Sequence, residues 1–216
     1  MKTILISIAF LFTSLSGMTQ SKQYYAAMGE ALGQYANCKS VSDFQALGNR
    51  FGLIADAEKT EWLPLYYQAH CYIIMSFMEP TDAKKKDEYL DVAEKAIEKM
   101  LALAPNESEA YTLQGFCYTA RLVVNPMERG QKYSMLSGQS LGKALALDPN
   151  NPRAKVLKLQ NEMGAAKFFG KDPAEYCGQA IELYAKWDDY KPKSPLYPVW
   201  GKSQAERVVQ ECKAGS

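Results

Sequence analysis

Along most of the chain, apolar residues recur every three or four positions, which places them on one face of an α-helix. In the clearest run, residues 86–103, charged residues fill the positions between the apolar ones. The apolar residues of this run are Tyr89, Leu90, Ala93, Ile97 and Leu101. Related patterns predict helices at residues 21–37, 41–57, 62–77, 107–123, 130–147, 152–163, 173–187 and 199–213. The sequence therefore predicts an all-α protein of about eight helices in hairpins, together with a C-terminal capping helix.

Two stretches of the chain repeat each other. Residues 68–72 match residues 114–118 at an offset of 46, and residues 101–106 match residues 145–150 at an offset of 44. A period of this size is typical of stacked helix hairpins. The best repeat units are residues 62–105 and 106–149. Residues 20–61 and 150–216 form divergent or capping units of the same domain.

The second unit carries a recognisable series of residue types. An aromatic, a small residue and a tyrosine are followed on the next helix by a small residue, a bulky apolar residue, an alanine and a proline. These are Tyr111, Gly115, Tyr118, Ser137, Leu141, Ala144 and Pro149. The series resembles the signature of the tetratricopeptide repeat (TPR) family. From Tyr111 to Pro149 is 38 residues, about ten more than the family pattern. We expect the extra residues in an enlarged turn within each hairpin, as in a divergent exported bacterial member.

The TPR resemblance implies a right-handed α-solenoid whose first helices line a concave groove for a protein or peptide partner. The positions that line the groove in the TPR family correspond to two sets of candidate groove contacts in this sequence. These are Tyr66, His70, Ile73 and Ile74, and then Glu109, Thr112, Phe116 and Thr119. An apolar stripe through Ile73, Ile74 and Phe116 needs a covering surface, which a bound peptide or a homodimer would each provide.

The N-terminal segment has the order of a cleavable secretory signal. Lys2 precedes an apolar run from Ile4 to Leu15, and small and polar residues follow up to Gln20. We expect residues 1–19 to be removed and residues 20–216 to form the mature periplasmic or secreted domain. The apolar run is too short for a permanent membrane span. A retained N-terminal anchor helix is the alternative.

The charge composition of the chain argues against one class of partner, nucleic acid. Hydrophobic residues make up 47% of the chain, and 25 Lys and Arg face 24 Asp and Glu. Such a balance gives no basic surplus for phosphate contacts, so nucleic acid is not expected as a partner.

The five cysteines are widely spaced and form no zinc-binding pattern. They are Cys38, Cys71, Cys117, Cys177 and Cys212. Small buried thiols are the default for most of them. Cys177 and Cys212 lie on the last two helices, which should run antiparallel. Export would allow a disulfide between them, and free thiols remain the alternative.

The sequence contains no recognisable arrangement of catalytic residues. His70 is the single histidine, and no nucleophile motif accompanies it. It is either a groove contact or a structural imidazole. We expect no catalytic residues, no metal site and no cofactor, and therefore no enzyme.

The sequence favours an exported, non-enzymatic scaffold that binds a protein or peptide in a concave helical groove. A carbohydrate- or small-ligand-binding accessory protein of an export or uptake system is the alternative, with aromatic groove residues as platforms. The chemistry of the groove would separate the two, because an apolar strip suits peptides and aromatic faces suit sugars.

Overall fold

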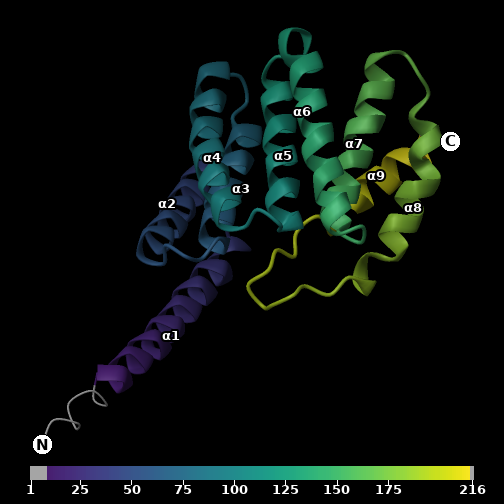
Figure 1. Cartoon of the computed structure of the whole chain (residues 1–216). Helices are drawn as coiled ribbons and strands as arrows, with labels where there is room; N and C mark the ends of the chain where they lie inside the picture. Colours follow the sequence, from purple (N-terminus) through teal and green to yellow (C-terminus); the bar gives the residue numbers. More distant parts are fainter. Residues whose placement is uncertain (1–8, 215–216) are drawn as a thin grey trace, which may run out of the picture.

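The computed structural model describes residues 9–214, and side chains from residue 22 onward. Within this part every regular element is helical, as the periodicity predicted (Figure 1). The α-helices are α1 (Ala9–Tyr35), α2 (Val41–Ala57), α3 (Leu63–Met78), α4 (Ala83–Leu103), α5 (Ser108–Val124), α6 (Pro126–Leu147), α7 (Pro152–Phe168), α8 (Cys177–Ala185) and α9 (Lys202–Ala214). Two short 3₁₀ helices, η1 (Pro173–Tyr176) and η2 (Trp187–Asp189), flank α8.

Consecutive helices pack as antiparallel pairs that follow one another along the molecule (Figure 1). Helix α3 pairs with α4, and α5 pairs with α6. The first helices of neighbouring pairs also touch, since α3 contacts α5 and α5 contacts α7. The predicted all-α architecture of stacked hairpins is confirmed.

Local capping explains where several helices begin. At α2, the hydroxyl of Ser40 accepts a hydrogen bond from the backbone N–H of Asp43, and the Asp43 carboxylate accepts one from the backbone N–H of Ser40. This capping box fixes the start of α2 at the predicted residue. At α4, the Asp82 carboxylate accepts from the N–H of Lys85. Helix α4 therefore begins at Ala83, three residues before the predicted start.

The expected enlarged turn within each hairpin is wrong. Only Asn125 separates α5 from α6, and the extra residues instead lengthen the second helices, α4 to 21 residues and α6 to 22. The Asn125 side chain accepts from the N–H of Glu128, and Pro126 occupies the first turn, where a missing N–H costs nothing. Helix α6 therefore starts at Pro126 rather than near residue 130.

The larger hydrophobic core runs through α1–α6 and reaches α7. Close helix approach is clearest at Gly115, where an added Cβ would lie 2.7 Å from Cγ of Leu141. The signature's small residue therefore lets α5 pack directly on α6.

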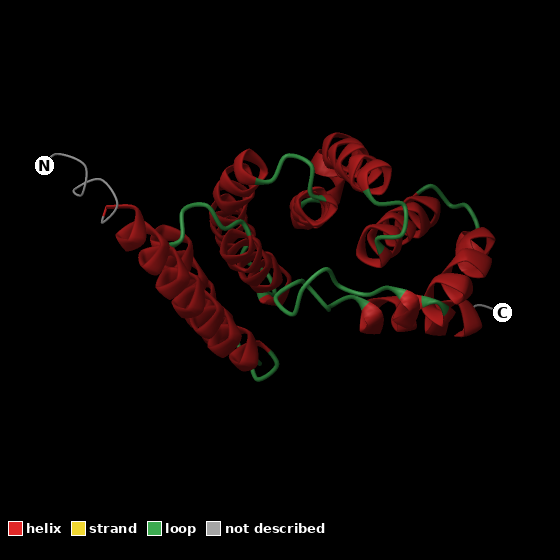
Figure 2. Ribbon diagram, turned by 60° about the horizontal axis from the view of Figure 1, so that its bottom comes forward, coloured by secondary structure: helices red, strands yellow, loops and turns green. Residues whose placement is uncertain are grey.

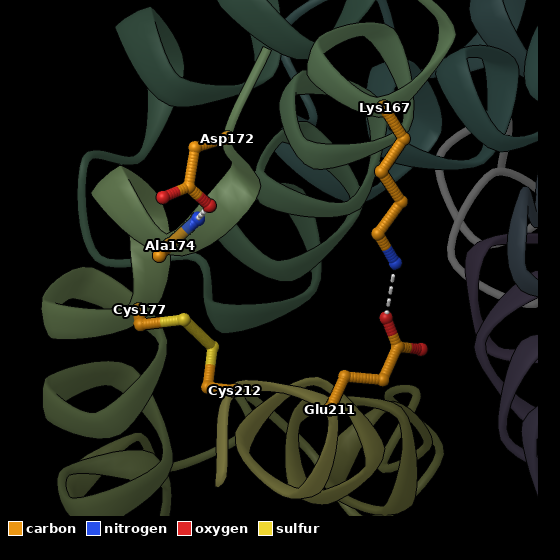
Figure 3. The surroundings of a disulfide bond; sticks show 6 residues. All are labelled: Lys167, Asp172, Ala174, Cys177, Glu211 and Cys212. Carbon is orange, nitrogen blue, oxygen red and sulfur yellow. Dashed lines mark hydrogen bonds and ion pairs between the residues drawn. A yellow bond between two sulfur atoms is a disulfide. The ribbon is translucent and has the colours of Figure 1, made fainter. Parts of the chain in front are cut away.

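A second, smaller core lies between α7, α8 and α9. Its buried residues are Val156, Leu159, Met163, Ala180, Trp187, Ala205, Val208 and Val209. Beside it, a disulfide joins Cys177 of α8 to Cys212 of α9, with 5.6 Å between their Cα atoms (Figure 3). An ion pair between Lys167 and Glu211 also connects α7 to α9 (Figure 3). The pairing that the sequence left open is therefore formed.

The remaining cysteines are free thiols. Cys71 and Cys117 are fully buried, and burial raises the pKa of both thiols. Cys38 is half-buried, and burial raises its pKa as well. Raised pKa values keep these groups protonated and weakly reactive, which fits a packing role.

Part of the predicted signal peptide, residues 1–8, lies outside the described residues, and residues 9–19 form the start of α1. In the described part of the chain, no helix is both long and apolar enough to cross a membrane.

Candidate functional site

The segment between η2 and α9, residues 190–201, has no regular structure and crosses the inner side of the helical arc (Figure 2). We call it the strap. The hydroxyl of Tyr67 on α3 donates to the carbonyl oxygen of Leu196 at 2.8 Å. Nε1 of Trp200 donates to the hydroxyl of Tyr66 at 2.9 Å. The strap therefore binds residues that lie about 130 positions earlier in the chain and covers the concave face.

Of the sequence-predicted groove residues, Tyr66, His70 and Phe116 contact Trp200 of the strap. Six of the eight are buried, namely Tyr66, His70, Ile73, Glu109, Thr112 and Phe116. The Trp200 ring lies on His70 and Phe116, with ring centroids 4.8 Å and 5.5 Å apart. Ile74 and Thr119 are half-buried. Of the apolar stripe, Phe116 is thus covered by Trp200 of the strap, and Ile73 is buried as well.

His70 is enclosed by aromatic rings. Its Nδ1 forms a hydrogen bond with the Tyr35 hydroxyl, and its buried Nε2 has no hydrogen-bond partner. Burial, aided by the nearby charge of Arg153, lowers the pKa of His70 to about 3. The imidazole is therefore neutral at physiological pH. Of its two sequence-based interpretations, this burial favours the structural one.

A buried ion pair lies where the strap ends meet the helices. Nε of Arg153 donates to Oε2 of Glu109 at 2.9 Å, and the Asn151 amide donates to Oε1 at 2.8 Å. Glu109 and Arg153 are each 1% exposed. Burial raises the pKa of Glu109, and the hydrogen bonds from Arg153 oppose that rise. Each charge is buried only because the other compensates it.

An open cavity lies between α7 and α8. Its volume is about 720 Å³, and its walls come from the end of α6, from α7, from α8 with the following Lys186, from Asp189 of η2 and from the first two residues of the strap. The lining residues are Leu145, Asn150, Pro152, Lys155, Lys158, Leu159, Glu162, Gln179, Glu182, Leu183, Lys186, Asp189, Tyr190 and Lys191. This volume is within the range of pockets that enclose small organic ligands.

The cavity is lined by both apolar side chains and lysines. Leu145, Leu159 and Leu183 supply aliphatic surface, and Tyr190 adds the single aromatic ring. Four lysines surround them, namely Lys155, Lys158, Lys186 and Lys191. Burial raises the pKa of the Tyr190 phenol to about 12, so the phenol is protonated at neutral pH.

Carboxylates neutralise part of the positive charge of these four lysines. Lys158 pairs with Glu162, and Lys186 pairs with Glu182 at 2.7 Å. The ammonium of Lys191 donates to the backbone carbonyl oxygen of Asp188. With Asp189, three acids face four lysines in the lining. The lining therefore offers aliphatic surface together with a small excess of lysines that could face an anionic group.

Sequence reasoning did not single out these lining residues, although one signal was present. Lys155 and Leu159 occupy positions where the TPR signature has an aromatic and a small residue. Both line the cavity. A departure from a repeat signature can mark a site that the neighbouring unit lacks.

A second cavity, about 460 Å³, lies between α4, α5 and α6. Leu101 in this cavity matches Leu145 in the larger one at the repeat offset of 44, so the two grooves are equivalent. The smaller groove has Glu94, Glu98 and one lysine, Lys132. The cluster of four lysines is therefore specific to the larger cavity.

We searched residues 9–214 for side chains that could together bind a metal ion. No three or more His, Cys, Asp and Glu side chains of this part lie together as a possible metal-binding group.

Comparison with known proteins gives one clear relationship. No family model and no curated protein matches the chain. Among solved structures, the HusA haemophore from Porphyromonas gingivalis matches with a TM-score of 0.77 and 30% sequence identity. The match covers 89% of this chain and 94% of that one. A haemophore is a binding protein, in agreement with the prediction that this chain is not an enzyme. Because similarity of this extent spans nearly the whole fold, the chain belongs to the family of the HusA haemophore.

Proposed function

We propose that this protein is an exported, non-enzymatic haem carrier of a haem uptake system, and that the cavity between α7 and α8 holds the haem. The relationship to a haemophore supports the ligand class. The chemistry of the cavity supports the location. The small-ligand alternative is thus favoured over a peptide-binding scaffold.

Haem is a flat apolar macrocycle with two propionate groups at one edge. The leucines and Tyr190 offer apolar surface to the ring, and the lysines offer cations to the propionates. Lys155 and Lys191 are exposed, so their ammonium groups can turn toward a ligand. This combination of apolar walls and four lysines in one cavity is the observation that carries the proposal.

Iron ligation contributes little in this proposal. Among the residues that line the cavity, Tyr190 is the single member of the usual axial haem ligands His, Cys, Met and Tyr. Its pKa of about 12 disfavours the phenolate that would bind ferric iron. The ring and the propionates then supply most of the affinity, so metal-free protoporphyrin IX should bind almost as well as haemin.

The concave face is a weaker candidate for ligand binding. Its TPR-like groove positions are largely buried, and the strap already occupies them. A peptide would have to displace Trp200 and Leu196 before it reached them. A homodimer formed through the same stripe would meet the same obstacle.

The test is a haemin titration of residues 20–216, followed by absorbance at the Soret band. We expect saturable binding of one haemin that weakens as the salt concentration rises. Replacing Lys155 and Lys191 with glutamate should weaken haemin binding about tenfold or more, since two attractive charges become repulsive. The matched control replaces Lys95 and Lys99, exposed on α4 away from this cavity, with glutamate.

Two results would count against the proposal. Absence of saturable haemin binding by the wild-type protein would reject the function. Equal losses of affinity in the two lysine pairs would keep haem binding but reject the cavity as its site.

A further inference from the structure

The buried pair formed by Glu109 and Arg153 lies beside the proposed haem cavity without lining it. Three hydrogen bonds join the guanidinium to the carboxylate, at 2.6 to 3.0 Å. An ion pair this deep gains little net stability over apolar residues of similar size. A role other than stability therefore needs to be considered.

The guanidinium of Arg153 also contacts the strap at its first residue. Its central carbon lies 5.1 Å from the centroid of the Tyr190 ring, within the range of a cation–π interaction. Tyr190 is the aromatic residue that lines the cavity. Arg153 thus lies over the face of a ring that also lines the cavity.

The same arginine contacts the last residue of the strap. Gly201 has a φ of +109°, and a Cβ there would lie 3.2 Å from Cγ of Arg153 and 2.8 Å from the ring of Trp187. Only glycine fits this conformation and this space without strain. Both ends of the strap are therefore packed on one side chain, which Glu109 holds in place.

We propose that Arg153, oriented by Glu109, is a positioning residue that holds Tyr190 as a wall of the haem cavity. Arg153 and Glu109 do not touch the ligand in this arrangement. They act through the Tyr190 ring, which the cation–π contact keeps against the cavity. The effect on haem affinity rests on the proposed function, whereas the positioning of Tyr190 does not.

The experiment is a mutant cycle read by haemin affinity. Replacing Glu109 with glutamine together with Arg153 with methionine removes both charges and leaves no unpaired buried ion. We expect haemin binding to weaken about threefold to thirtyfold, the size of a buried cation–π contact. Tyr190→Leu should cause a similar loss, and Tyr190→Phe, which keeps the ring, should bind like the wild type.

The decisive variant combines all three changes. If Arg153 acts through Tyr190, haemin binding in Glu109→Gln/Arg153→Met/Tyr190→Leu should be no weaker than in Tyr190→Leu alone. Additive losses would overturn the proposal. The control is Glu94→Gln/Arg121→Met on α4 and α5, which removes a buried arginine and one of its three carboxylate partners at a place that does not line this cavity, and should leave haemin affinity unchanged.

A second measurement needs no ligand. Hydrogen exchange of the ligand-free protein should become faster at residues 189–191 in the paired Glu109/Arg153 variant, while α3 and α5 stay protected. Unchanged exchange at these residues would overturn the proposal, whether or not haemin binds. If circular dichroism shows that the paired variant is unfolded, Arg153→Lys replaces it in both measurements. Lysine keeps the charge but loses the planar contact with Tyr190 and the paired hydrogen bonds to Glu109.

Discussion

The two hydrophobic cores of this protein are built differently. The larger core repeats one hairpin plan from α1 to α6, and each helix pair buries its apolar face against the next. The smaller core gathers only eight buried residues from α7, α8, η2 and α9. A core of that size rarely supports itself, and here a disulfide and the strap reinforce it. Repetition stabilises one region, and covalent and long-range links stabilise the other.

Helix α7 belongs to both regions. Ala154 and Leu157 face the larger core, and Val156 and Leu159 face the smaller one. The proposed haem cavity lies at this boundary, with one wall from each region. Changes in the smaller region should therefore affect ligand binding before they affect the rest of the fold.

The largest expected effect comes from emptying the larger core. Phe51 is fully buried and stacks on Tyr67, so Phe51→Ala should lower the free energy of unfolding by about 3–5 kcal/mol. Chemical denaturation followed by circular dichroism would measure this. Trp187→Ala, in the smaller core, is the matched variant. Hydrogen exchange should show its loss confined to α8 and α9, and equal loss in α3 would show that the cores are one cooperative unit.

Removing the disulfide tests the smaller region directly. The bond closes a segment of 35 residues, so Cys177→Ser/Cys212→Ser should destabilise α8 and α9 by about 3–4 kcal/mol. The expected readout is faster hydrogen exchange there, with α2–α5 unchanged. Cys38→Ser, at a half-buried free thiol, serves as the control. If the double variant exchanges like the wild type, the small core does not need its crosslink.

Acid should act on the larger core instead. His70 is neutral when folded, with a pKa of about 3, whereas its ordinary value is 6.5. Between those values the unfolded state takes up the proton, so the free energy of unfolding falls by about 1.4 kcal/mol per pH unit as the pH decreases. The stabilising contribution is complete above pH 6.5. Denaturation at pH 6.5 and 4.5 should show a smaller decrease for His70→Gln, and equal decreases would contradict the assignment.

The smallest effect is expected at the surface of the boundary. The ion pair between Lys167 and Glu211 is about half exposed on both sides. Exposed pairs of this kind contribute less than about 1 kcal/mol. Lys167→Ala should therefore shift the denaturation midpoint only slightly, and a loss near that of the disulfide variant would show that α9 depends on this contact.

Much of the repeat-built region could be predicted from its sequence. Helix α2 spans the predicted residues 41–57, because its start depends on the neighbouring capping residues Ser40 and Asp43. Gly115 was recognised as the small residue of the repeat signature, and the structure shows the close packing that it allows. The start of α6 was wrong because Asn125 and Pro126 were not recognised as a cap and first turn. Local chemistry determined both helix starts.

The candidate site could be predicted much less well. The strap carries no periodic pattern, and its hydrogen bond between Trp200 and Tyr66 joins residues 134 positions apart. Nothing near Trp200 in the sequence specifies that partner. The four lysines of the cavity come from α7, from the residue that follows α8 and from the strap, so only the fold brings them together. Tertiary arrangement, rather than residue pattern, decides the site.

The strap also sets how many hairpins this architecture can hold. An ordinary helical array is open at both ends and can gain or lose units. Here the strap, a segment of fixed length, returns from the α8 end of the array and bonds to α3. It therefore links the two ends of the helical arc. One more hairpin would widen the span by about 10 Å, and an extended strap would need about three more residues to follow it. Repeat number and strap length must therefore change together when members of this family diverge.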